Sequence, residues 1–235
     1  MDKKYIYANQ SSLWGEPECV GFGIDDFYIK EIDRKLANKI IINNQYSKKV
    51  YSATYLHLGL FYKNELSGVL QYGYAMNPAS CGSVVKGTKQ KEYLELNRMW
   101  ISDDCKQYAE SQAISYSIKY IKKKLKTIKW IQSFADERCG GFGIVYQACS
   151  FDYYGEHNSI FWTLEGQIYH NSLMTRNPKL SKSAKYLQEN KNNATSQTLR
   201  QFRYIKFIDK REKKNCLLKQ MPYPKHYKEG IEKNG

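Results

Sequence analysis

The segment between residues 93 and 155 constrains the fold most strongly, because patterns typical of strands and helices alternate along it. Residues 93–101 (YLELNRMWI) and residues 129–136 predict strands. Between them, a basic amphipathic stretch predicts a helix that ends near Lys126, and a glycine-rich turn after the second strand leads into a short helix over residues 143–150. This order of strands and helices predicts an α/β fold in which helices pack against a central sheet.

The flanking segments add further elements to this sheet. Residues 1–24 are expected to form turns, with Trp14 anchored on the core, and residues 25–43 predict a helix because their apolar residues recur at spacings of three and four. The dipeptide Lys63-Asn64 predicts a tight hairpin turn between two strands. The strands predicted outside the central segment cover residues 55–62, residues 66–74 and, as a pair, residues 151–169.

Basic residues are concentrated in the C-terminal part of the chain. The 235 residues carry a formal net charge of +14, and residues 172–235 alone hold 16 Lys and Arg against 5 Asp and Glu. This excess favours an anionic partner, nucleic acid first, while a solvated lysine-rich surface from an AT-rich genome is the alternative. The candidate DNA-binding residues are Lys122, Lys123, Lys124, Arg200, Arg203, Lys206, Lys210 and Arg211.

This charge distribution also suggests a division of the chain. We expect a catalytic domain over residues 1–171 and a basic C-terminal extension over residues 172–235 that is partly packed on the core and is a candidate DNA-binding segment. Within the extension, residues 176–198 are polar and are expected to be mobile, whereas residues 199–210 return to an ordered pattern.

Cysteine and histidine spacings argue against a structural zinc site. None of the six cysteines forms a CxxC pair, and the four histidines are scattered along the chain. The sequence has neither the pattern of a signal peptide nor a long apolar run. We therefore expect a cytoplasmic protein with reduced thiols and no membrane partner.

Three polar side chains near the ends of the central elements are the first candidates for a functional site. Asp136 ends the second strand and suits a general base or a metal ligand, with a turn or helix-capping role as the alternative. Tyr146 on the short helix suits a general acid or an oxyanion donor, although with 21 tyrosines in the chain a packing role is the alternative. Arg98 lies within the first strand. Polar groups at the ends of adjacent strands of an α/β sheet are where such folds place binding sites.

Arg98 interrupts a strand that is otherwise rich in apolar residues. Strict alternation would place it on one face with Leu94, Leu96 and Trp100, and an arginine on an apolar face needs a partner because an unpaired buried charge is costly. Two alternatives have equal weight. Arg98 forms a structural ion pair with Asp136, or it has a functional role in which it orients that carboxylate or binds an anionic or carbonyl group.

The predicted order of elements is typical of the GNAT acyltransferase fold. In that fold a glycine-rich loop after the fourth strand holds the pyrophosphate of coenzyme A at a helix N-terminus. Here residues 101–110 contain no glycine, and Asp103 and Asp104 would repel a pyrophosphate, so conventional acetyl-CoA binding is disfavoured. Ser102 or Asp103 is expected to cap the helix that follows. The glycine-rich residues 140–143 could instead form an anion-binding turn before a helix, with a tight strand-to-helix turn as the alternative.

Several motifs in a fixed order resemble the Mom family of phage DNA-modification proteins. The resemblance covers about residues 40–225, and the combination of its motifs is more specific than any one of them. The matching segments are Asn44-Gln45-Tyr46-Ser47, the strand ELNRMW, the strand end SFAD, the block GxVYQAxxFxYxG over residues 143–155, and the C-terminal RYIKFIDKRE with PYPK.

The resemblance implies a GNAT-like enzyme that converts adenine in duplex DNA to N6-carbamoylmethyladenine and so protects phage DNA from restriction in the host cytoplasm. The family's site residues fall on Arg98, Asp136 and Tyr146, with Gln45 at a position where the family has a histidine. Chemistry on a paired adenine requires base flipping. The candidate substrate-binding residues are Tyr46, Asn97 and Ser133.

The resemblance also bears on the cofactor and the donor. In the family, the histidine is proposed to hold iron together with the residues that correspond to Asp136 and Tyr146. Glutamine is a poor ligand for iron, so we expect no metal in this chain. The alternative is a weak iron site at Asp136 and Tyr146. The donor is expected to be an activated glycine such as glycyl-tRNA, or acetyl-CoA. The rival functions are an N-acyltransferase that acts on a protein or small-molecule amine and a non-catalytic DNA-binding protein on a GNAT scaffold.

Overall fold

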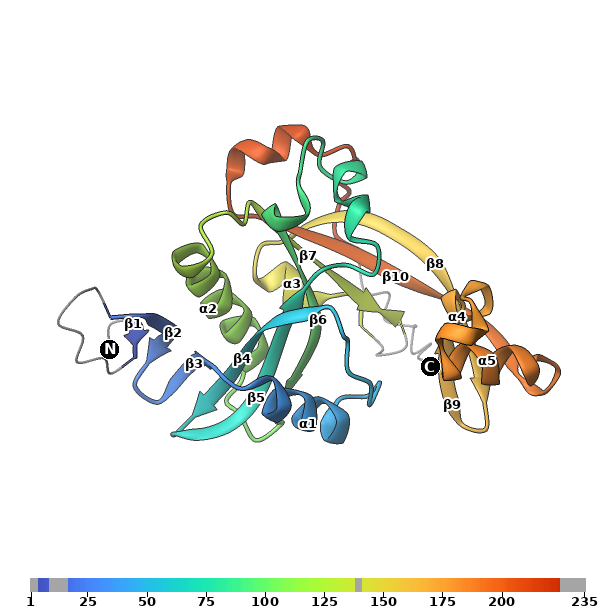
Figure 1. Ribbon diagram of the computed structural model, residues 1–235. Coiled ribbons are helices and arrows are strands. Elements are labelled where there is room, and N and C mark those ends of the chain that lie inside the picture. The colour runs from blue at the N-terminus through green and yellow to red at the C-terminus, as the bar shows by residue number, and fades with distance from the viewer. Residues whose placement is uncertain (1–3, 9–16, 138–140, 225–235) are drawn as a thin grey trace, which may run out of the picture.

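One mixed sheet organises the part of the chain that the structure describes. The structure is a computed structural model (Figure 1) and describes residues 4–8, 17–137 and 141–224, so Trp14 and Gly140 lie outside it. In order across the sheet, the strands are β1 (Lys4–Tyr7), β2 (Cys19–Ile24), β3 (Phe27–Glu31), β4 (Thr54–Tyr62), β5 (Glu65–Gly73), β6 (Tyr93–Ile101), β7 (Trp130–Asp136), β10 (Thr195–Phe207), β8 (Asp152–Leu164) and β9 (Gln167–His170). The predicted mixed α/β fold is confirmed.

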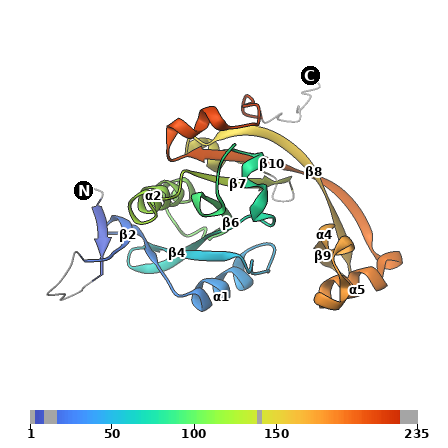
Figure 2. The same ribbon diagram turned by 45° about the horizontal axis from the view of Figure 1, so that its top comes forward.

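Helices cover both faces of this sheet. The α-helices are α1 (Arg34–Asn44), α2 (Ala109–Lys124), α3 (Ile144–Ala148), α4 (Ser172–Thr175) and α5 (Lys182–Glu189). Figures 1 and 2 show α1 and α2 on opposite faces of the central strands. Successive residues of β5 point to opposite faces of the sheet. Leu70 packs in the core on the α2 side, whereas Val69 packs against Ala37 and Ile41 of α1. Among the described residues, no helix is both long and apolar enough to cross a membrane.

The N-terminal elements differ from those predicted. Residues 1–24 include the strands β1 and β2, and the helix predicted over residues 25–43 divides into β3 and the shorter α1. Ile29 belongs to β3, where it pairs with Leu60 of β4. Its spacing from the isoleucines of α1 happens to match the periodicity of a helix, which explains the incorrect prediction. The helix begins only after Asp33, whose Oδ1 accepts hydrogen bonds from the first backbone amides of α1.

The short hairpin turn between β4 and β5 is as predicted. Lys63 and Asn64 both have positive φ, at 50° and 69°, which is the geometry that a two-residue turn of the right twist requires. The loop that follows β5 contains two 3-10 turns, Pro78–Ser83 and Gln90–Glu92, and its Val85 forms a bridge to Cys216 near the C-terminus. The loop is therefore anchored at its middle on the C-terminal segment.

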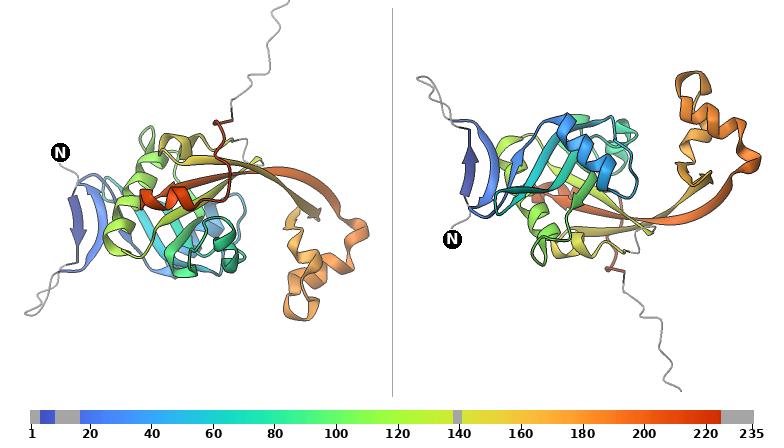
Figure 3. Two further views of the ribbon diagram at one scale, coloured as in Figure 1. Left: turned by 90° about the horizontal axis from the view of Figure 1, so that it is seen from above. Right: turned by 90° about the horizontal axis from the view of Figure 1, so that it is seen from below.

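Strand β10 comes late in the chain and lies between β7 and β8. Its residues 201–207 pair with β7, whereas residues 195–200 pair only with β8, so this end of the β8–β10 ribbon leaves the body of the sheet. The ribbon carries β9, α4 and α5, and we call residues 158–200 the arm (Figures 2 and 3). Residues 176–198, which were expected to be mobile, include α5, whose Ala184 and Leu187 are fully buried; their mobility stays a prediction. The domain boundary at residue 171 stays a prediction.

Candidate active site

A pocket opens where β6 and β7 separate. These two strands are parallel and pair over only three positions, the last being Glu95 with Gln132. Beyond that point Ser133 Oγ still donates a hydrogen bond to the carbonyl of Leu96 at 3.3 Å, and then the strands diverge. The pocket in the opening has a volume of about 460 Å³, within the range of small-molecule sites. The sheet itself therefore leaves the polar ends of two central strands accessible.

Four segments line this pocket. The end of α1 supplies Gln45 and Tyr46, β6 supplies Leu96 to Met99, β7 supplies Phe134 to Asp136, and the turn with α3 supplies the rest. Six of the predicted site residues meet here: Gln45, Tyr46, Asn97, Arg98, Asp136 and Tyr146. Ser133 does not line the pocket; it is fully buried and joins the two strands.

A β-bulge at Asn97 corrects the predicted faces of β6. The pairing with β5 steps from Leu96 to Arg98 and leaves Asn97 as an extra residue. An extra residue reverses the alternation that follows it. Leu96 consequently packs in the core on the α2 side, whereas Trp100 packs against α1 on the other side, and the single face predicted for Leu94, Leu96, Arg98 and Trp100 was wrong.

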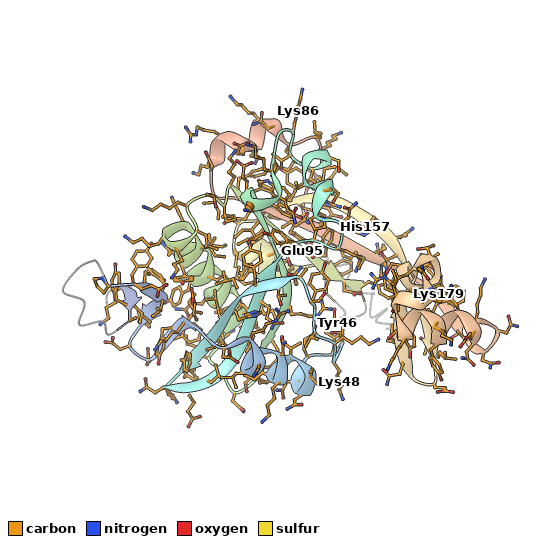
Figure 4. All side chains as sticks on the ribbon, in the orientation of Figure 1. Tyr46, Lys48, Lys86, Glu95, His157 and Lys179 are labelled. Carbon is orange, nitrogen blue, oxygen red and sulfur yellow. The ribbon has the colours of Figure 1, made fainter. Side chains whose placement is uncertain are left out.

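The arginine beside the bulge connects the strand to the loop after α1. Arg98 Nη1 donates to the carbonyl of Asn97 at 2.7 Å, and its Nε donates to the carbonyl of Lys49 at 3.1 Å. The guanidinium also lies over the ring of Tyr51, 5.7 Å from its centroid. Arg98 therefore holds the loop that carries Tyr46 against the pocket, and Tyr46 itself is exposed at the rim (Figure 4).

Asn97 offers a buried acceptor in the pocket. Its Nδ2 donates to the carbonyl of Tyr74 at 3.1 Å and to Glu95 Oε1 at 2.9 Å. Its Oδ1 is buried, and no group among the described residues donates a hydrogen bond to it. A buried acceptor without a donor is costly, so a ligand that donates an N–H or O–H at this position is favoured.

Glu95 is a polar residue of this region that the sequence reasoning missed. Its carboxylate accepts from Gln132 Nε2 at 2.8 Å and from Asn97, near the centre of the molecule (Figure 4). Burial raises the pKa of Glu95 to about 7, against the opposing effects of these two hydrogen bonds and of the nearby Arg203 and Arg98. An ionisable residue in the middle of a predicted central strand was the available signal.

The glycine that begins α3 places Tyr146. Gly143 has φ of +79°, and a Cβ at this position would lie 2.4 Å from the ring of Tyr204. Tyr146 is buried, with its ring centroid 5.4 Å from that of Tyr204 and 5.7 Å from that of Phe151. Asp136, the last residue of β7, is also buried and pairs in register with Gln201 of β10.

The geometry at Gln45 does not suit an iron ligand. Its side-chain Oε1 accepts from the backbone N–H of Ser47 at 3.0 Å and from Ser47 Oγ, so the oxygen that would face a metal is already engaged. These residues do not fit an iron site that takes its third ligand from Gln45.

The connection from β6 to α2 differs from the predicted one. The helix begins at Ala109 rather than after Ser102 or Asp103, and the capping position is held by Tyr108 in the left-handed region with φ of 64°. Ser102 Oγ instead donates to Asp104 Oδ2 at 3.0 Å, within a short turn. A carboxylate held at this turn is unfavourable for a bound pyrophosphate.

The eight candidate DNA-binding residues fall into three groups. Five of them bind groups within the chain, and the carboxylates involved partly neutralise their charge. Their partners are Glu18 and Glu31 for Lys124, Glu137 for Arg200, Gln132 for Arg203, the carbonyls of Cys149 and Ser150 for Lys206, and Asp209 for Arg211. Lys123 lies over the ring of Tyr5. Lys122 and Lys210 instead line a second cavity of about 810 Å³ together with Lys89, Lys91 and Lys126. Their contact with DNA stays a prediction.

Comparison with known proteins places the chain in a family. Among solved structures, it is similar to the ribosomal L7/L12 alpha-N-protein acetyltransferase RimL (TM-score 0.45, 11% identity, 79% of this chain and 95% of that one) and to a ribosomal-protein-S5-alanine acetyltransferase from Vibrio fischeri (TM-score 0.47, 10% identity, 81% and 98%). The methylcarbamoylase mom of Escherichia phage Mu is 44% identical over 226 residues, which cover 95% of this chain and 94% of that protein. The model of the Mom protein family matches residues 26–225. The chain therefore belongs to the Mom protein family, as its motifs predicted.

Proposed function

We propose that this chain is a transferase that converts adenine in double-stranded DNA to N6-carbamoylmethyladenine and thereby protects phage DNA from restriction in the host cytoplasm. The observation that carries the proposal is the pocket between β6 and β7, which gathers Asn97, Arg98, Asp136 and Tyr146. The 44% identity to the phage Mu methylcarbamoylase supports the same chemistry for this chain.

The pocket residues have complementary roles in this proposal. Asp136 accepts a proton from the exocyclic amine of adenine, Tyr146 donates a proton or stabilises the developing oxyanion, and Arg98 binds the carbonyl of the donor. The unsatisfied Oδ1 of Asn97 accepts a hydrogen bond from the remaining N6–H. Tyr46, exposed at the rim, stacks on the base after it has left the duplex.

The donor in the proposal is an activated glycine, such as glycyl-tRNA, with acetyl-CoA as the alternative. Adenine N6 attacks the glycyl carbonyl, loses a proton to Asp136 and releases the carrier hydroxyl. The glycyl amine then attacks C6 and closes a five-membered ring, after which the bond from C6 to the original N6 breaks. The original N6 becomes the carboxamide nitrogen, and the product carries CH2–CONH2 on a new N6.

The first test is nucleoside mass spectrometry of plasmid DNA from cells that express the chain. The expected result is a deoxyadenosine in which CH2–CONH2 replaces one hydrogen, and its loss in Asp136→Ala. Asp25→Ala is the matched control, because Asp25 is exposed and pairs with Lys4 outside the pocket. Modification that persists in Asp136→Ala would reject the role of this carboxylate. A soluble wild-type protein that leaves all adenines unmodified would favour an N-acyltransferase or a DNA-binding protein.

A second test concerns the rearrangement alone. DNA with 15N in the exocyclic amine of adenine is modified, and the product is fragmented to separate the carboxamide from the ring. The label is expected in the carboxamide nitrogen. A label that stays on the nitrogen bound to C6 would exclude the five-membered intermediate while leaving the overall modification intact.

A further inference from the structure

The arm presents an exposed leucine on a hydrogen-bonded turn. Leu180 is 82% exposed, the largest exposed fraction among the large hydrophobic residues that the structure describes. It ends the 3-10 turn Pro178–Leu180, in which the Asn177 side chain accepts from the Lys179 N–H at 3.0 Å and the Asn177 carbonyl accepts from the Leu180 N–H at 3.1 Å. The next residue, Ser181, caps α5. The local hydrogen bonds therefore hold this apolar side chain in solvent.

The surroundings of Leu180 are positively charged. Lys179 and Lys182 lie on either side of it in sequence, and Arg176 precedes the turn. The only acidic residues of the arm are Glu165, which accepts a hydrogen bond from Tyr186 at 2.7 Å, and Glu189, which pairs with Lys185 at 3.8 Å. An apolar side chain among cations matches a partner that is anionic at its surface and apolar inside. Duplex DNA, with phosphates outside and stacked bases inside, has this character.

The arm is joined to the rim of the pocket. Lys49 Nζ donates to the carbonyl of Ile168 on β9 at 2.6 Å and lies over the ring of Tyr169, 4.6 Å from its centroid. The carbonyl of the same Lys49 accepts the hydrogen bond from Arg98. Figure 4 shows Lys179 on the arm and Tyr46 on the loop after α1, to which Lys49 also belongs. A duplex whose base enters the pocket would therefore lie within reach of the arm.

We propose that Leu180 is a wedge that enters the base stack beside the target adenine, while the adjacent lysines hold the phosphates. This inference rests on the proposed modification of duplex DNA and assigns the step that makes a paired adenine accessible. An inserted aliphatic side chain replaces the stacking that the flipped base loses, so the extrahelical state becomes more populated. The turn keeps Leu180 in position before DNA binds, which avoids the ordering cost of a mobile loop.

The experiment compares Leu180→Ala with Leu217→Ala, because Leu217 is also an exposed leucine, at 58%, but lies outside the arm. Modified adenine in plasmid DNA is measured for each variant in cells. In vitro, 2-aminopurine replaces the target adenine in a fully paired duplex and in one where it faces a mismatch, and its fluorescence reports unstacking on binding. Thermal unfolding controls for stability.

Leu180→Ala is expected to lower plasmid modification by about tenfold or more and to abolish the fluorescence rise on the paired duplex, because unstacking a base step is costly. The rise on the mismatched duplex should remain, since that base is already weakly held. Leu180→Met should restore both signals, and Leu217→Ala should behave as the wild type.

Each contrary outcome separates this inference from the proposed function. Wild-type levels of modification and fluorescence in Leu180→Ala would overturn the wedge and leave the modification standing. A wild-type protein that modifies no adenine would reject the proposed function, while the fluorescence rise would still decide whether Leu180 opens the duplex. Binding to vesicles of anionic lipid that is lost in Leu180→Ala, with unchanged DNA signals, would also overturn the wedge and assign Leu180 to a membrane surface.

Discussion

Replacing Gly143 by alanine should destabilise the protein by about 2–5 kcal/mol. Two effects contribute, and the structure separates them. Gly143 has φ of +79°, and a residue with a side chain costs roughly 1–2 kcal/mol in this left-handed region. The added Cβ would also lie 2.4 Å from Cε2 and 2.8 Å from Cζ of Tyr204, and overpacking a core of this kind costs about 1–3 kcal/mol.

A second glycine supplies the control for the backbone effect. Gly166 has φ of +74°, but a Cβ at that position would meet no atom within 4 Å. Gly166→Ala should therefore cost only the conformational part, roughly 1–2 kcal/mol. Urea denaturation gives the free energy of unfolding of each variant, and the difference between the two variants isolates the contact with Tyr204.

Two results would refute this reasoning. One is a Gly143→Ala variant that loses no more stability than Gly166→Ala, which would mean that the ring of Tyr204 does not crowd this position. The other concerns a double-mutant cycle with Tyr204→Leu, because a smaller side chain should relieve part of the clash and make the two losses less than additive. Strict additivity would show that the two residues do not interact. Because Gly143 begins the helix that carries Tyr146, we also expect reduced modification activity in Gly143→Ala.

Two further predictions concern charge. Burial raises the pKa of Glu95 from 4.5 to about 7, so between these pH values the folded state holds a proton that the unfolded state releases. The free energy of unfolding should therefore fall as the pH rises from 4.5 to 7, and urea denaturation of Glu95→Gln over the same pH range should no longer show this fall. An unchanged fall in Glu95→Gln would assign it to another group. Lys124→Ala should lower the free energy of unfolding by roughly 1 kcal/mol, because Lys124 pairs with Glu18 and Glu31. Lys122→Ala should leave that free energy unchanged and reduce by about 1 the slope of the logarithm of the DNA-binding constant against the logarithm of the salt concentration. Equal slopes for Lys122→Ala and the wild type would remove Lys122 from the DNA contacts.

The residues of the pocket were largely predictable, but their arrangement was not. Asp136 and Tyr146 stood out because local patterns placed them at the end of a strand and on the next helix. The raised pKa of Glu95 could not be predicted, because it depends on burial by segments that are distant in sequence, as is its hydrogen-bond partner Gln132. The fully buried Ser133 illustrates the same limit, since its hydrogen bond to Leu96 exists only where two parallel strands meet.

Local chemistry by itself determined several features of this protein. The alternation in residues 93–101 and 129–136 predicted β6 and β7, the pair Lys63-Asn64 predicted a turn with positive φ, and the order of motifs predicted the family. The strands and the turn depend on neighbouring residues, whose backbone preferences and periodicity act over a few positions, whereas the family follows from motifs in order along the chain.

Only the tertiary structure decided how these elements combine. The bulge at Asn97 depends on the register with β5, and the insertion of β10 between β7 and β8 depends on pairing across more than 60 residues of sequence. The arm exists because β8 and β10 continue beyond the end of β7. Strand pairing is set by contacts between residues that are distant along the chain. The periodicity within one segment therefore predicts neither the register of a strand nor which strands lie next to it.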